Sequence, residues 1–188
     1  MGDLVGKILV MIVGFSMLFF IPMMVLALKQ DTTTQAYVDN ATVEFVDDIR
    51  GSGKITPLAY ETFAKKIYSA VPHAEIEIYH EALYMTGSTD FLVAGYDTTH
   101  NYEAAVFDKE DILAAMYGTE ASGYYDDEHL KSYELKKGDH IKVSCYNVTP
   151  TLGGRLLGSI LPKYDGRRAI FASYGGYVGN NMQTELYE

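Results

Sequence analysis

The sequence ILVMIVGFSMLFFIPMMVLAL occupies residues 8–28 and contains no charged residue. As a helix rising about 1.5 Å per residue, these 21 residues span roughly 31 Å, which matches the hydrocarbon core of a bilayer. A cleaved signal peptide is the competing interpretation, but its apolar core is about 7–15 residues long and ends at a small-x-small site. Residues 27–29 read Ala-Leu-Lys, a poor cleavage site. We therefore predict an uncleaved transmembrane anchor over residues 1–30.

The predicted anchor is apolar on all faces, which is typical of a helix surrounded by lipid or by other apolar helices. We assign four of its residues to membrane or assembly contacts: Ile8, Phe15, Phe19 and Pro22. Pro22 removes one backbone donor and is expected to bend the helix. The short leader and the large domain behind the anchor favour a cytoplasmic N-terminus and an extracytoplasmic C-terminal domain in the cell membrane.

The helical pattern continues beyond the anchor. Val38, Ala41, Phe45 and Ile49 recur at helical spacing, and the acidic residues of this region lie away from that stripe. We expect one helix from about residue 4 to residue 50, ended by residues 51–53, Gly-Ser-Gly. The stripe must pack either on the chain's own domain or on a neighbour. Residues 31–53 are called the stalk below, and Val38, Phe45 and Ile49 are its predicted assembly contacts.

Residues 54–188 are predicted to form an extracytoplasmic domain. Thr56 and Pro57 begin a second helix that Val71-Pro72 ends, and Asp108 caps a short helix over residues 109–117. Apolar and polar residues alternate in several segments, which predicts strands. The expected strands cover residues 74–85, 91–96, 102–107, 140–147 and 168–178, with a short helix over residues 149–160. The predicted fold class is α+β, a long N-terminal helix and a short helix packed with an antiparallel sheet.

Composition excludes several functions. The net charge of −10 argues against nucleic-acid binding, and a single cysteine excludes an intramolecular disulfide. Residues 126–129, Asp-Asp-Glu-His, could hold a divalent cation, although a solvated acidic turn is the favoured interpretation. The five histidines lack the spacing of a zinc site, and Cys145 alternates in phase with apolar neighbours as a core residue does. We therefore expect no catalytic, cofactor-binding or metal-binding residue and a protein that is not an enzyme.

A membrane-embedded helix containing a proline, followed by a sheet domain, resembles the lollipop plan of type IV pilins and pseudopilins. Four segments are also similar to poorly characterised membrane proteins of Gram-positive bacteria that are similar in layout to components encoded with Tad-type pilus machines. These segments are FVDDIRGSGKITPLAYETFAKKI (residues 45–67), KGD (137–139), KVSCYNVTPT (142–151) and IFASYGGYV (170–178). Prepilins carry Glu at the fifth mature position, whereas Lys7 or Met11 would stand there after cleavage at Gly2 or Gly6. This departure from the prepilin pattern favours a minor, tip or assembly component over a major filament subunit.

The sequence leads to two hypotheses of function. The first is a non-enzymatic, pilin-like subunit of a type IV or Tad-related filament or secretion apparatus, whose partners are the bilayer and other pilin-like subunits. In this hypothesis the stripe Val38–Ile49 packs against neighbouring helices. The alternative is a monomeric, membrane-anchored binding or sensing domain, in which the stalk packs within its own chain. A membrane-tethered hydrolase is disfavoured because the sequence nominates no nucleophile and base.

Overall fold

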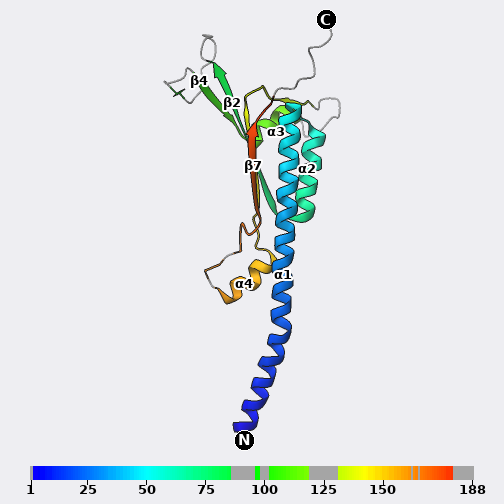
Figure 1. Ribbon diagram of the computed structural model, residues 1–188, viewed down its shortest axis with the longest axis vertical. Coiled ribbons are helices and arrows are strands. Elements are labelled where there is room, and N and C mark those ends of the chain that lie inside the picture. The colour runs from blue at the N-terminus through cyan, green and yellow to red at the C-terminus, as the bar shows by residue number, and fades with distance from the viewer. Residues whose placement is uncertain are drawn as a thin grey trace.

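A computed structural model describes residues 2–85, 96–97, 102–118, 131–161, 163–164 and 166–179. One long helix forms the axis of the molecule, and the remaining elements lie along the half of it farther from the N-terminus (Figure 1). The predicted α+β class, with a long apolar N-terminal helix and an antiparallel sheet, is confirmed. The division of the chain at residues 30 and 53 stays a prediction.

Helix α1 runs without interruption over Gly2–Ser52, which corresponds to a length of about 77 Å. It passes through Pro22 and through three consecutive threonines that have low helix propensity. Thr32 and Thr33 donate hydrogen bonds of 3.0 Å to backbone carbonyls one turn earlier. Gly53 ends the helix with a φ of 69°, and its amide donates to the Ile49 carbonyl. The predicted single helix is confirmed.

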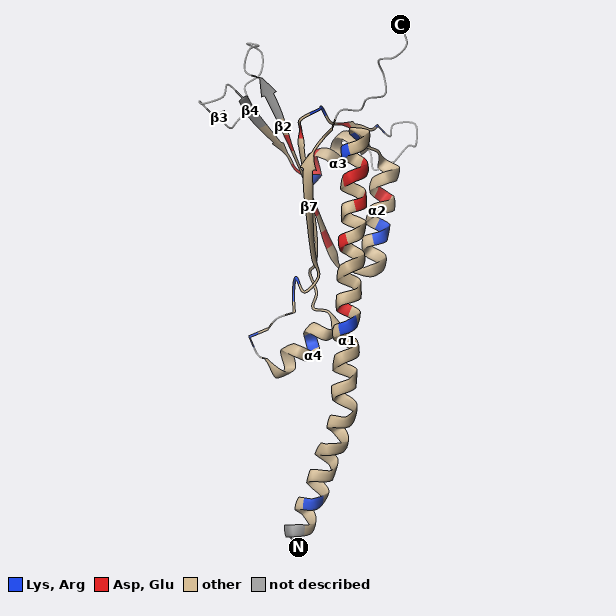
Figure 2. Cartoon of the chain, in the orientation of Figure 1, with Lys and Arg blue, Asp and Glu red and all other residues tan. Residues whose placement is uncertain are grey.

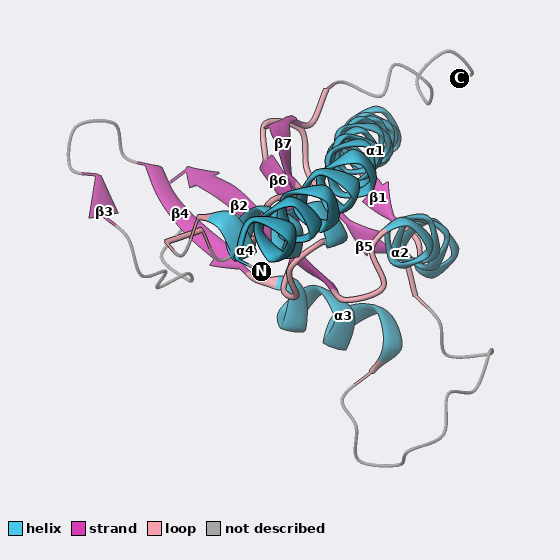
Figure 3. Ribbon diagram, turned by 90° about the horizontal axis from the view of Figure 1, so that it is seen from below, coloured by secondary structure: helices cyan, strands magenta, loops and turns pink. Residues whose placement is uncertain are grey.

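The sheet contains five antiparallel strands in the order β3-β4-β2-β6-β7. Their bounds are β2 Ala74–Met85, β3 Tyr96–Asp97, β4 Tyr102–Phe107, β6 His140–Asn147 and β7 Phe171–Tyr177. A separate pair joins β1 (Lys54–Ile55) to β5 (Tyr133–Glu134). The other helices are α2 Pro57–Ala70, α3 Lys109–Tyr117 and α4 Leu152–Ile160. Seen from below, α1, α2 and α3 surround one side of the strands (Figure 3).

The core lies between one face of this sheet and the helices. In the β2–β6 register, Ile76 pairs with Cys145 and Ile78 pairs with Val143, and all four side chains are buried. The opposite face of β2 carries the acidic residues, as the alternation predicts. One sheet face therefore needs an apolar cover, and α1, α2 and α3 supply it.

The stalk stripe is part of this core. Val38, Phe45 and Ile49 are only 1–5% exposed, and the Phe45 ring stacks on Phe63 of α2 at 4.2 Å between centroids. The expectation that neighbouring stalks cover these three residues is therefore corrected. The physical reason is that the sheet and α2 present apolar surface of the same chain to the stripe.

Local signals placed most element ends correctly. Thr56 caps α2 and accepts a hydrogen bond from the Ala59 amide, while Asp108 forms a capping box on α3. Two starts differ from the prediction. Helix α4 begins at Leu152 rather than residue 149, because Thr151 caps it and accepts from the Gly154 amide. Strand β7 begins after Arg168, whose φ of 54° is left-handed. Most of the strand expected at residues 91–96 lies outside the described residues.

The burial of Phe45 predicts that it stabilises the domain. Replacing it (Phe45→Ala) removes a buried ring and is expected to lower the free energy of unfolding by about 3–5 kcal/mol. Urea unfolding of the full chain in detergent, followed by tyrosine near-UV circular dichroism, measures this change. Val43→Ala, at a 37% exposed position of the same helix, is the control and should change stability by less than about 1 kcal/mol. Equal effects of the two substitutions would contradict the packing described.

Candidate membrane and assembly surface

The N-terminal half of α1 protrudes from the domain and is not covered by any described part of the chain. Its apolar window is long enough to cross a membrane, and none of it is buried. Phe15 and Phe19 are 65% and 64% exposed, and Ile8 is 52% exposed. A core helix of a soluble protein would be mostly buried, and this uncovered apolar helix is compatible with a single membrane span.

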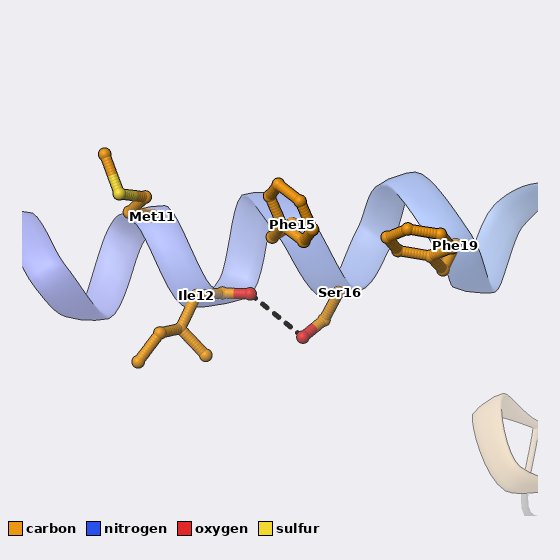
Figure 4. Close-up of a pocket in the computed structure, with 5 residues that line it drawn as sticks. All are labelled: Met11, Ile12, Phe15, Ser16 and Phe19. Atoms are coloured by element: carbon orange, nitrogen blue, oxygen red, sulfur yellow. Dashed lines mark hydrogen bonds between the residues drawn. The ribbon is translucent and has the colours of Figure 1, made fainter.

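Polar atoms in this surface are satisfied within the helix. A shallow hollow lies between Met11, Ile12, Phe15, Ser16 and Phe19 (Figure 4). The Ser16 hydroxyl donates to the Ile12 carbonyl at 2.9 Å, and the Phe15 and Phe19 rings lie 5.6 Å apart. No side chain of the hollow is charged, so it suits acyl chains or apolar side chains rather than a polar substrate.

The domain first meets α1 at the end of the apolar segment. Ala27 is buried, and Asp31 accepts a 2.7 Å hydrogen bond from the hydroxyl of Thr151, the N-cap of α4. A Cβ atom at Gly153 would clash with the Asp31 carboxylate and would lie 3.3 Å from Leu28. A side chain at position 153 would therefore displace the Asp31 carboxylate from its contact with Thr151.

Above this junction, α1 covers the edge strand of the sheet. The Gln35 side chain forms two hydrogen bonds of 2.8 Å with the backbone N–H and C=O of Phe171, as a neighbouring strand would. Arg50 donates to the carbonyl of Tyr177 at the other end of β7. Both ends of an otherwise unpaired edge are thereby held to the helix, which fixes the direction of the anchor relative to the sheet.

The outward face of the stalk is acidic. Glu44, Asp47 and Asp48 are exposed there, and Figure 2 shows acidic residues along this part of α1. Lys66 pairs with Glu44 at 2.7 Å, and Arg50 pairs with Asp47 at 2.8 Å. These ion pairs offset two of the three carboxylate charges on this face.

A buried polar cluster joins the sheet to the loop before β6. The His80 ring contacts the Tyr133 hydroxyl at 2.7 Å and an Asp139 carboxylate oxygen at 2.9 Å. The same oxygen accepts from the Lys136 amide at 2.7 Å. His80 and Asp139 are each 3% exposed, so the cluster is closed to solutes and braces the loop.

Cys145 is confirmed as a core residue. It is fully buried, its nearest polar partner is the Thr42 hydroxyl at 3.9 Å, and burial raises the pKa of its thiol to about 11. The thiol therefore stays protonated at neutral pH. Among the described residues, no three His, Cys, Asp or Glu side chains are grouped to hold a metal ion. Residues 126–129 lie outside the described residues.

The structure separates the predicted assembly residues into two sets. Ile8, Phe15, Phe19 and Pro22 lie exposed on the protruding part of α1, whereas the three stalk residues are in the core. Sequence reasoning missed Gln35, Asp31 and the His80 cluster. The sequence signal for the burial of His80 is the alternation of β2, which places His80 on the same face as the buried Ile78. Nothing in the sequence indicates what Gln35 or Asp31 would meet.

Comparisons with known proteins add no relative. No protein-family model matches the chain, and neither a curated protein nor a solved structure is similar to it.

The raised pKa of Cys145 predicts an unusual pH dependence of thiol reactivity. In the folded full chain, modification by a disulfide reagent should be very slow at pH 7.5. Its rate should continue to rise toward about pH 11, because the proton leaves only there. Ser132→Cys in a Cys145→Ala background offers an exposed comparison thiol whose rate should level off above pH 9 or so. Equal rates for the two thiols at pH 7.5 would show that Cys145 is accessible.

The His80 cluster predicts a cost for losing its acceptor. Asp139→Ala removes the carboxylate that accepts from the Lys136 amide and contacts one His80 nitrogen, and should lower the free energy of unfolding by about 1–3 kcal/mol. The control is Glu134→Ala, which removes an exposed carboxylate. Asp108 is also exposed, but it is unsuitable as a control because it caps α3. Urea titration of both full-length variants in detergent makes the comparison. A loss no greater for Asp139→Ala than for Glu134→Ala would argue against a bracing role.

Proposed function

We propose that this chain is a single-pass, membrane-anchored, pilin-like subunit that is not an enzyme. The observation that carries the proposal is the uncovered apolar half of α1, which continues as one helix into the domain. Its C-terminal domain lies outside the cytoplasmic membrane, and the N-terminus faces the cytoplasm. Its partners are the bilayer and other pilin-like subunits of a type IV or Tad-related machine.

The energetics of exposure support a membrane or a helix bundle as the environment of this segment. Burying one large apolar side chain is worth about 1.5–3 kcal/mol. Most side chains of residues 4–28 are exposed, so leaving them in water would cost tens of kcal/mol, estimated roughly at the same rate. Both lipid and neighbouring apolar helices remove this cost.

The assembly surface in this proposal is the protruding segment. Val38, Phe45 and Ile49 are already buried, so a neighbour can contact only residues such as Ile8, Phe15 and Phe19. Stored in the bilayer, this segment would exchange lipid contacts for contacts with like helices during assembly. The absence of Glu at the expected fifth position favours a minor or assembly role over a major filament subunit.

A second function is favoured by the burial of the stalk stripe within its own chain. Val38, Phe45 and Ile49 lie in the domain's core, which suits a monomeric domain held on a simple anchor. Such a domain would bind or sense a ligand outside the membrane. The two functions differ in whether the anchors of two copies meet.

Cysteine crosslinking in membranes separates the two functions. In a Cys145→Ala background, single cysteines at each of residues 13–20 scan two turns of the anchor around Phe15 and Phe19. A pilin-like subunit should give like-with-like adducts at positions recurring every three or four residues, because one helix face meets its copy. Assembly should tolerate Val43→Cys on the acidic face without an adduct.

Each outcome of the scan decides between the functions. Periodic adducts that persist when the protein is diluted in excess lipid support the pilin-like subunit. An absence of adducts at all eight positions, with the protein retained in membranes after alkaline extraction, supports the monomeric tethered domain. Release of the protein by alkaline extraction would contradict both, since both require the anchor.

A further inference from the structure

We propose that α4 and the loop after it form a membrane-surface foot that binds the headgroups of anionic lipids. The foot is defined as residues 152–161, 163 and 164, with Lys29 of α1 beside it. This inference rests on the proposed anchor and adds a second, peripheral contact with the same bilayer. It names a surface outside the helix that crosses the membrane.

The position of α4 along α1 carries the first part of the argument. If residues 8–28 fill the hydrocarbon core, the headgroup layer of about 5–7 Å covers roughly the next four residues of the helix. Asp31 falls within this layer, and it is the residue that Thr151 binds at the start of α4. Among the elements beside α1 in Figure 1, α4 lies nearest the N-terminal end. The anchor depth therefore places α4 at the bilayer surface.

The exposed apolar side chains of α4 are the second observation that supports the foot. Leu152 and Ile160 are 52% and 54% exposed, and Leu161 just beyond the helix is 52% exposed. Leu152, Leu156 and Ile160 recur every four residues, so they share one side of the helix. An exposed apolar side on a helix at the membrane surface is typical of interfacial helices, which bury it about 5–10 Å into the headgroup region.

The charge around α4 is the third observation that supports the foot, and it favours anionic lipids. The chain as a whole is acidic, with a net charge of −10, yet residues 151–170 contain four basic residues and one acidic residue. Lys29, Arg155 and Lys163 are all exposed. Figure 2 shows basic residues at α4, at the neighbouring turn of α1 and in the loop that follows, while acidic residues lie along the stalk. Asp31 at the same junction offsets one of these three positive charges, and the remaining positive charge attracts anionic headgroups.

The start of α4 packs closely against α1 and against Gly166. Gly153 packs against Leu28 and Asp31, and Gly154 approaches Gly166 so closely that an added Cβ would lie 3.0 Å from its Cα. Lipid binding by the foot would therefore set the tilt of α1 and the height of the sheet domain above the membrane. The domain's orientation would then depend on the anionic lipid content.

Single-tryptophan quenching tests the foot, because the chain contains no tryptophan. Three full-length variants are reconstituted in vesicles: Ile160→Trp in the foot, Phe19→Trp in the anchor and Leu58→Trp at a 75% exposed position of α2. Vesicles contain either phosphatidylcholine alone or phosphatidylcholine with phosphatidylglycerol. Each is prepared with acyl chains brominated near the headgroup or near the methyl end.

The expected results differ for the three positions. Phe19→Trp should be quenched in all vesicles, and Leu58→Trp in none. Ile160→Trp should be quenched more by the shallow bromines than by the deep ones, and more strongly with phosphatidylglycerol. Adding Arg155→Gln and Lys163→Gln to the Ile160→Trp variant removes two positive charges. Each charge is worth about a fivefold change in binding, so the ratio of lipid-bound to lipid-free foot should fall by about 30-fold. High salt should produce a similar loss.

Three outcomes would overturn the inference, and they are distinguishable from failure of the anchor. Quenching of Phe19→Trp without quenching of Ile160→Trp leaves the anchor intact and refutes the foot. Quenching that is equal in neutral and anionic vesicles refutes headgroup recognition. A blue shift of Ile160→Trp that depends on protein density but not on bromine would show that a second copy covers α4. No quenching of Phe19→Trp would instead refute the proposed function.

Discussion

The structure depends on the packing of one helix face against its own sheet. A five-stranded sheet with one apolar face needs a cover, and α1 provides it through residues that recur at helical spacing from Val38 to Ile49. The stack of Phe45 on Phe63 ties the same face to α2. Because this cover is the C-terminal half of a helix 51 residues long, the other half has no domain to pack on and extends as an uncovered apolar rod.

This division of α1 links the fold to the proposed function. Gln35 and Arg50 hold the two ends of the edge strand β7, so the helix and the sheet form one body. Asp31 and Thr151 extend that body to the point where the apolar segment ends. A bilayer or helix bundle that holds the protruding half would therefore also orient the domain. In such an arrangement α4 is positioned to sense the surface from which the helix emerges.

Much of the local structure could be predicted because its causes are local. Thr56 with Pro57, Asp108 with Asp111, and the alternation of β2 each act within a few residues of the chain. The candidate site was predicted only in part. Phe15 and Phe19 are exposed on the uncovered half of α1, and their assignment to membrane or assembly contacts stays a prediction. The partner of His80 is Asp139, 59 residues away. No spacing rule connects two residues that only strand pairing and a loop bring together.

The sequence by itself determined the length and continuity of α1, the apolar character of its first half and the existence of a stripe on its second half. Uncharged residues and helical periodicity are sufficient for these features. Only the tertiary structure decided that the stripe packs inside the chain and that α4 meets α1 at Asp31. The physical reason is that the hydrophobic effect is non-directional: a periodic pattern specifies which face must be buried, but not which surface buries it.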